Sequence, residues 1–202
     1  MGKLIFRYAT MNSGKTLDLI IRAYNYVETN QKVIIMKPKI DSKGDTKIVS
    51  RTGLEQNVNI LIDKDDNIFE LLKQKLENVK AILIDEAQFL NAEQIDELLI
   101  LSKALDIDVI CYGLRLNFRM EAFEGSKRLL EIAEHLEEFK SLCECGDSAR
   151  YVGRKVNNEY VLEGEEVVID GTANIEYVPL CSKCYLEKVK KVDFAKIKKK
   201  VR

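Results

Sequence analysis

The segment Ala9–Thr16 constrains the fold of this chain most. It follows a short apolar run, Leu4–Phe6, and precedes a segment with helical periodicity, Leu17–Val27. A strand, a tight loop and a helix are therefore expected in that order. The segment ends in Gly-Lys-Thr where the helix opens, which is typical of a phosphate-binding loop.

Each residue of this Gly-Lys-Thr triplet has a chemical reason to be there. Gly14 lets the backbone approach a phosphate. The N–H groups and the dipole at the start of the helix favour the negative charge of that phosphate. Lys15 supplies a cation for the β- and γ-phosphates, and Thr16 offers a hydroxyl to Mg²⁺. The full pattern begins with Gly, whereas this chain has Ala9, which tolerates positive φ poorly. An ordinary strand–turn–helix corner is the alternative.

Composition narrows the functional classes. The 202 residues are 46% hydrophobic, enough for one substantial core and a small appendage. The formal net charge of −1 argues against non-specific nucleic-acid binding as the main role. The Lys-rich end, Lys188–Arg202, is expected to be a solvated tail, with a nucleic-acid or partner role as the alternative. We find no signal peptide and no apolar stretch of the ~20 residues that span a bilayer, so a soluble cytoplasmic protein is expected.

Apolar runs and helical periodicities alternate along residues 1–140. Buried strands are predicted at 33–36, 58–62, 81–84 and 109–112, helices at 17–30, 68–76, 92–105 and 126–136, and a long loop at 40–57. The first helix is expected to face inward with Leu17, Ile20, Ile21, Tyr24 and Val27. This order predicts an α/β fold of P-loop NTPase type, with a parallel sheet and helices on both faces. Loops after the strands, at 9–16, 85–89 and 113–119, should converge on one crevice.

The hydrophobic pattern of the sequence changes from helical periodicity to short alternating runs near Ser141. Short alternating runs at 149–152, 159–162, 167–169 and 177–178 predict a small antiparallel β domain. We therefore predict a P-loop nucleotide-binding domain at 1–140, a small β domain at 141–191 and a basic tail at 192–202.

Two carboxylates follow the apolar strand at 81–84. An apolar strand ending in Asp is the second half of a Mg²⁺–ATP site, so Asp85 is expected to hold Mg²⁺ with Thr16. Neighbouring side chains of an extended segment diverge, so Glu86 can reach the acceptor side and take a proton from an attacking hydroxyl. Two solvated acids are the alternative.

Four of the five cysteines fall late in the chain, as Cys143, Cys145, Cys181 and Cys184. Four thiolates bind Zn²⁺ tetrahedrally in structural sites, so a zinc centre is predicted. The one-residue spacing of the first pair is tighter than usual. The alternatives are a redox pair at Cys181 and Cys184, or a site that has lost its metal. Cys111 lies in an apolar strand and is expected to be a buried small hydrophobe.

These motifs together resemble the zinc-containing, P-loop thymidine kinase family (type II), which includes the cytosolic vertebrate enzyme and most bacterial ones. The resemblance runs to about Lys190. It is carried by residues 11–16, 85–89 (Asp-Glu-Ala-Gln-Phe), 113–119 (Gly-Leu-Arg-Leu-Asn-Phe-Arg), 167–171 with Tyr177, and the paired cysteines.

The resemblance implies transfer of the γ-phosphate of ATP to the 5′-hydroxyl of thymidine, giving dTMP and ADP in nucleoside salvage for DNA synthesis, with Glu86 as general base. It implies ATP contacts from Ala9, Thr10, Met11, Asn12, Ser13, Gly14, Lys15, Thr16, Asp85, Glu86, Ala87 and Gln88. It implies thymidine contacts from Met11, Gln88, Phe89, Leu114, Phe118, Val167, Val168, Ile169, Asp170, Gly171 and Tyr177. Residues 167–171 would form a lasso loop over the base; core packing is the alternative for Phe118 and Tyr177.

Three departures from the family pattern stand out. Ala9 replaces the first Gly of the loop, and Asp170 stands where the lasso usually has Gly. Lys43 replaces an Arg near the transferred phosphate; Arg51 could substitute for it, and the sequence leaves the two open. Deoxyuridine as a second acceptor and dTTP as a feedback inhibitor are likewise left open, while the family suggests a homotetramer.

A second hypothesis comes from another class. The chain would be a P-loop ATPase whose zinc knuckle binds nucleic acid, with Glu86 activating water. The appendage has few basic residues interleaved with aromatic ones, which argues against it.

Overall fold

The computed structural model describes residues 1–39, 46–164 and 175–201. Contacts divide the chain into two compact units. The first unit comprises Met1–Ala9, Gly14–Arg115 and Ala122–Phe139, and the second comprises Thr10–Ser13, Leu116–Glu121 and Lys140–Arg202.

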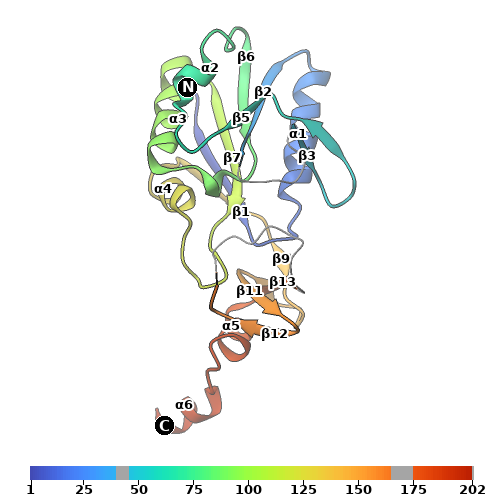
Figure 1. Cartoon of the computed structure of the whole chain (residues 1–202), viewed down its shortest axis with the longest axis vertical. Coiled ribbons are helices and arrows are strands. Elements are labelled where there is room, and N and C mark those ends of the chain that lie inside the picture. The colour runs from blue at the N-terminus through green and yellow to red at the C-terminus, as the bar shows by residue number, and fades with distance from the viewer. Residues whose placement is uncertain (40–45, 165–174, 202) are drawn as a thin grey trace. The chain divides into compact units, whose positions relative to one another are not determined.

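A six-stranded parallel sheet forms the centre of the first unit (Figure 1). Its strands are β1 (Leu4–Ala9), β2 (Lys32–Pro38), β5 (Ile60–Ile62), β6 (Val79–Ile84), β7 (Asp108–Leu114) and β8 (His135–Glu138), in the order β5-β2-β6-β7-β1-β8. The central strands are apolar on both faces because both faces are covered, which is the usual condition of a parallel sheet.

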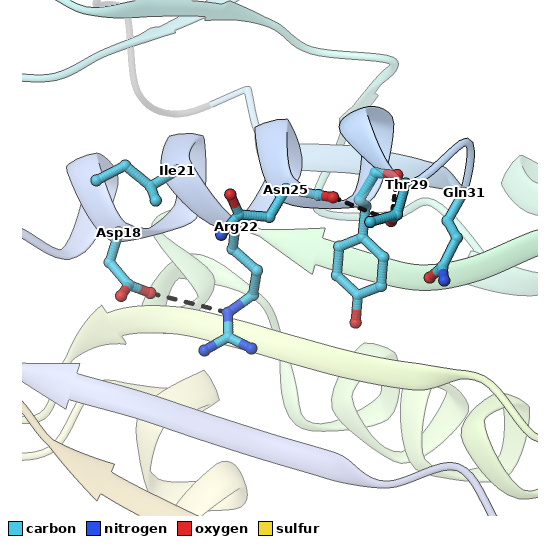
Figure 2. A pocket seen from close by; sticks show the side chains of 7 residues that line it. Asp18, Ile21, Arg22, Asn25, Thr29 and Gln31 are labelled. Atoms are coloured by element: carbon cyan, nitrogen blue, oxygen red, sulfur yellow. Dashed lines mark hydrogen bonds and ion pairs between the residues drawn. The ribbon is translucent and has the colours of Figure 1, made fainter.

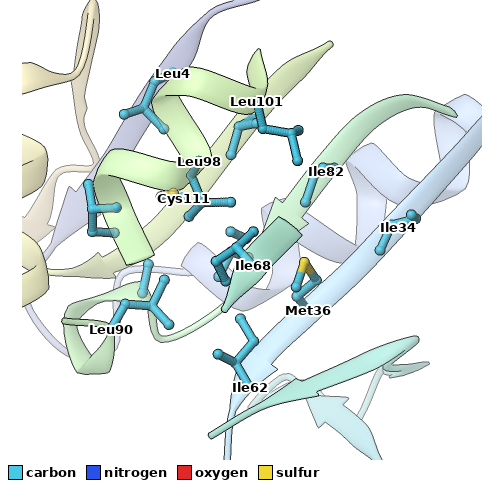
Figure 3. Packing of buried hydrophobic residues seen from close by; sticks show 14 of the residues in the cluster. Leu4, Ile34, Met36, Ile62, Ile68, Ile82, Leu90, Leu98, Leu101 and Cys111 are labelled. Atoms are coloured by element: carbon cyan, nitrogen blue, oxygen red, sulfur yellow. The ribbon is translucent and has the colours of Figure 1, made fainter. Parts of the chain in front are cut away.

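Helices cover the two faces separately. Helix α1 (Lys15–Glu28) lies on one face, and α2 (Ile68–Leu72), α3 (Ala92–Leu105) and α4 (Glu124–Ile132) lie on the other (Figure 1). The larger core lies under the second group, where Ile68, Leu98 and Leu101 pack against Met36 and Ile82 (Figure 3). The predicted α/β class, with a parallel sheet and helices on both faces, is confirmed.

Three predicted elements are wrong in part. The loop predicted at 40–57 contains, in its described part, an antiparallel hairpin of β3 (Lys47–Val49) and β4 (Glu55–Asn57). The helix predicted at 68–76 ends at Leu72. The helix predicted at 126–136 ends at Ile132, and the chain then forms edge strand β8. Strand β8 is exposed throughout, so it lacks the apolar run that marks a buried strand.

The inward face predicted for α1 is wrong in part. Leu19, Ile20 and Ala23 are the apolar side chains that it buries, whereas Ile21, Tyr24 and Val27 are 49%, 59% and 62% exposed. Apolar residues occur around most of this helix, so spacing alone could not select the face. A shallow pocket runs along its outer side from Asp18 to Gln31 (Figure 2), and none of the predicted site residues lines it.

The second unit is small and mostly antiparallel. Strand β11 (Tyr151–Val156) lies between β12 (Glu159–Val161) and β13 (Ile175–Leu180), and β9 (Ser141–Leu142) pairs with β10 (Ser148–Ala149). The predicted β appendage is thus confirmed. The chain also forms α5 (Ser182–Lys188) and α6 (Phe194–Lys200), which were not predicted. None of the described helices has both the length and the apolar character that crossing a membrane requires.

The observed face of α1 predicts how its apolar residues contribute to stability. We expect Leu19→Ala to lower the free energy of unfolding by about 2–5 kcal/mol, because it leaves a cavity in the core. The matched variant Ile21→Ala should change it little. Urea unfolding of the two variants measures the difference, and an equal loss from both would contradict the packing described here.

Candidate active site and candidate metal centre

The phosphate loop begins where β1 ends. Ala9 keeps strand geometry, so the missing Gly requires no positive φ there. Gly14, immediately before α1, has φ 83°, which a glycine adopts without steric cost. In the second unit, the Thr10 and Ser141 hydroxyls are hydrogen-bonded at 2.5 Å, and the Ser13 hydroxyl donates to the Thr10 carbonyl at 3.0 Å.

Lys15 is buried in the first turn of α1, with its side chain 8% exposed. Burial lowers the pKa of Lys15, while the charges of Glu86 and Asp85 oppose that shift. The charge of Arg51 lowers it further, so this exposed guanidinium lies within electrostatic reach of Lys15. Arg51 is one of the two cations that the sequence left open. Lys43 lies outside the described residues.

Asp85 follows β6 directly and is 5% exposed. The Thr16 hydroxyl donates to its Oδ2 atom at 3.2 Å, and the Glu86 backbone N–H donates to Oδ1 at 3.1 Å. The structure thus brings together the two oxygen ligands predicted for Mg²⁺ from elements 69 residues apart. Hydroxyl and carboxylate oxygens suit this hard cation, so the donor set fits the predicted metal.

Burial raises the pKa of Asp85 to about 7, and the charge of Glu86 adds to this, while Lys15 opposes it. A cation bound at this carboxylate would need the ionised form, so its affinity should rise with pH.

Glu86 begins a short 3-10 turn, η1 (Ala87–Phe89), with φ 52°. The side-chain amide of Gln88 donates to Glu86 Oε2 at 2.5 Å. Its oxygen accepts from the Leu114 backbone N–H at the end of β7, at 3.1 Å. Glu86 is half-buried, so its carboxylate is accessible to a hydroxyl, whereas Gln88 is only 2% exposed.

The predicted thymidine contacts are spread over both units. Gln88, Phe89 and Leu114 lie in the first unit, where the edge of the Phe89 ring meets Phe123. Met11, Phe118 and Tyr177 lie in the second unit, with Tyr177 on β13. The predicted lasso, Val167, Val168, Ile169, Asp170 and Gly171, lies outside the described residues.

Phe118 is enclosed within the second unit. The Arg154 guanidinium lies 3.8 Å from its ring centroid and that of Arg119 lies 4.8 Å from it. These two arginines also donate to the carbonyls of residues 162–164. Sequence reasoning did not single out Arg154, because one arginine in an alternating strand gives no functional signal.

The four cysteines predicted to bind zinc are brought together. Their Sγ atoms all lie within 4.8 Å of one another, and those of Cys145 and Cys181 are 3.7 Å apart. Tetrahedral zinc with sulfur ligands at about 2.3 Å places them ~3.8 Å apart, so the spacing fits zinc and is too long for a disulfide. Burial raises the pKa of Cys143, but hydrogen bonds from the backbone N–H groups of Cys145 and Cys181 lower it. The resulting pKa is about 7, which favours a thiolate.

The cysteine cluster predicts one zinc ion per chain. Cys181→Ser should lose the zinc and lower thermal stability, since it also removes the sulfur that accepts the Cys184 N–H at the start of α5. Cys111→Ala is the matched control, because Cys111 is buried in β7 of the first unit. Metal analysis of the purified variants measures the stoichiometry; full zinc content in Cys181→Ser would contradict the site.

The raised pKa of Asp85 predicts a pH-dependent stability in the protein free of nucleotide and Mg²⁺. The folded state holds this proton up to about pH 7, whereas the ordinary value is 3.8. The stabilisation is therefore fully present below about pH 4 and is lost as pH rises through 7. Relative to wild type, Asp85→Asn should lose less free energy of unfolding across this window. Parallel curves from urea titrations would contradict the assignment.

Comparison with known proteins identifies the family. The sequence model of the thymidine kinase family matches residues 2–185. The thymidine kinases of Mannheimia succiniciproducens and Enterobacteria phage T4 are each 40% identical over 196 residues, covering 95% of this chain and 99% and 100% of theirs. That of Streptococcus gordonii is 38% identical over 189 residues, 93% of this chain and 97% of its own. Among solved structures, an ATPase domain matches with a TM-score of 0.45 at 14% identity over 93% of this chain and 84% of its own, too distant a likeness to inform function. This chain belongs to the thymidine kinase family.

Proposed function

We propose that this protein transfers the γ-phosphoryl group of ATP to the 5′-hydroxyl of thymidine, giving dTMP and ADP. Family membership across residues 2–185 carries the proposal. The geometry of the first unit supports it, because a phosphate-loop lysine, a buried Asp and an accessible Glu lie at the carboxyl edge of one parallel sheet.

The donor half of the reaction belongs to α1 and β6. Lys15 neutralises charge on the β- and γ-phosphates, and the N–H groups at the start of α1 bind their oxygens. Thr16 and Asp85 would hold Mg²⁺, which when bound neutralises the charge that develops on the phosphates. Arg51 is the proposed additional cation. Transfer then depends mainly on positioning and charge stabilisation.

The acceptor half belongs to Glu86. Its carboxylate accepts the proton of the 5′-hydroxyl as the oxygen attacks phosphorus, so that an alkoxide need not form first. Both oxygens of Asp85 already accept hydrogen bonds, one from the Thr16 hydroxyl and one from a backbone N–H. We therefore assign the base role to Glu86 and the metal-binding role to Asp85.

The remaining assignments rest on family membership. Met11, Leu114, Phe118 and Tyr177 would surround the thymine, and backbone groups of residues 167–171 would bind its edge. A wrong base would leave such groups unpaired, at about 1–3 kcal/mol each. We retain zinc at the four cysteines and the domain division 1–140, 141–191 and 192–202. Deoxyuridine use, a homotetramer, inhibition by dTTP and a cytoplasmic location are proposals of the same kind.

The proposed activity predicts ADP production that depends on thymidine. Glu86→Gln should lower kcat by roughly 10²–10⁴-fold, the usual contribution of a general base, while ATP still binds. The matched control Glu93→Gln, at an exposed position on α3, should keep full activity. A coupled ADP assay with and without thymidine measures both effects.

Two outcomes would contradict this assignment. ADP production stimulated by DNA or RNA but not by thymidine would indicate the nucleic-acid-dependent ATPase instead. Turnover in Glu86→Gln above about a tenth of wild type would remove Glu86 as the base.

A further inference from the structure

The side-chain amide of Gln88 is hydrogen-bonded at both ends within the first unit. Its Nε2 atom donates to Glu86 Oε2 at 2.5 Å, and its Oε1 atom accepts from the Leu114 backbone N–H at 3.1 Å. An ionised carboxylate only accepts and a backbone N–H only donates, so these two neighbours determine which way the amide is turned. Gln88 therefore links the carboxylate of Glu86 to the backbone of β7.

The backbone amide at the far end of this link is itself held in place. Leu114 is the last residue of β7 and pairs with Ala9 of β1 in the parallel sheet. Its carbonyl accepts a hydrogen bond from the Ser126 hydroxyl at 2.5 Å, and Ser126 is completely buried in α4. The sheet and α4 therefore fix the direction of the Leu114 N–H group that donates to Gln88 Oε1.

The space that Gln88 occupies depends on Gly113. A Cβ atom at position 113 would lie 2.7 Å from Gln88 Oε1 and 3.1 Å from the Gln88 backbone nitrogen. The first distance is shorter than real Cβ contacts allow. The glycine therefore serves close approach between β7 and η1.

Glu86 needs an external constraint because its own backbone is unusual. With φ 52° it adopts the left-handed conformation, which is uncommon for a residue other than glycine and carries some strain. A half-buried Glu side chain also has several rotamers, of which only some place the carboxylate for catalysis. One fixed donor to Oε2 selects among them.

We propose that Gln88 is a positioning residue that aligns the general base Glu86 and contacts neither nucleotide nor nucleoside. Its 2% exposure and the occupation of both amide ends leave it little surface for a ligand. This inference rests on the proposed role of Glu86. It differs from the family-based expectation that Gln88 binds ATP or thymidine.

The test compares kcat and KM for both substrates in purified full-length variants. In Gln88→Met, a side chain of similar size loses both hydrogen bonds, so kcat should fall roughly tenfold to a hundredfold, with little change in either KM. Gly113→Ala should displace the same amide without altering Gln88 and should lower kcat in the same direction. Gln94→Met is the matched control. Gln94 is another buried glutamine, at the start of α3, whose amide is hydrogen-bonded at both ends, and its loss should leave kcat unchanged.

Gln88→Glu adds a readout that a purely structural role would not change. The new carboxylate can still accept from the Leu114 backbone N–H but has no hydrogen to donate to Glu86 when it is ionised. If the donor to Glu86 is what matters, kcat should fall as in Gln88→Met while both KM values and the thermal stability change little.

The outcomes separate this inference from the proposed function. An increase in KM for thymidine or ATP with kcat unchanged in Gln88→Met would make Gln88 a ligand contact and overturn the proposal. Unchanged kinetics in Gln88→Met, or an equal loss of kcat in Gln94→Met, would also overturn it. Wild-type protein without thymidine-dependent turnover would instead refute the proposed function, and an active Glu86→Gln would remove the base on which this inference rests. Thermal unfolding and binding of a non-hydrolysable ATP analogue check that each variant is folded.

Discussion

The parallel pairing of β6 with β2 and β7 is the constraint on which the candidate active site depends. Ile84, the last residue of β6, is in register with Met36 on one side and Cys111 on the other. The next backbone N–H, that of Asp85, still donates to the Met36 carbonyl at 3.0 Å. Asp85 is therefore held by the sheet itself, and its burial follows from the apolar layers on both faces.

This position gives two adjacent carboxylates different environments. Asp85 remains within the sheet, where burial raises its pKa and Thr16 binds one of its oxygens. Glu86 leaves the sheet through a left-handed backbone conformation and is half-buried. Asp85 and the adjacent Thr16 hydroxyl supply two oxygen ligands that fit a metal ion, whereas the less buried Glu86 is the proposed base. Two neighbouring acids can take different roles because the chain changes direction between them.

Local sequence signals predicted the sheet, its helices and the residues at its carboxyl edge. Leu4–Phe6 with Gly14-Lys15-Thr16, and the apolar run ending at Asp85, each carry their information within a few residues. Long-range packing was not readable in the same way. Helix α1 buries Leu19 rather than Ile21 because Leu19 packs against the apolar side chains of the sheet. The exposed strand β8 has no apolar pattern that could have predicted it. The hydrogen bond between Gln88 and Leu114 joins residues 26 positions apart and involves a backbone group, so no side-chain motif predicts it.

The proposed activity is transfer of a phosphoryl group from ATP to a nucleoside hydroxyl at the carboxyl edge of this sheet. The most direct measurement follows the label from γ-³²P-ATP in a single turnover with thymidine and excess protein. We expect the label to appear on the 5′-oxygen of dTMP and inorganic phosphate not to accumulate. Label found only in inorganic phosphate, whether or not thymidine is present, would contradict it.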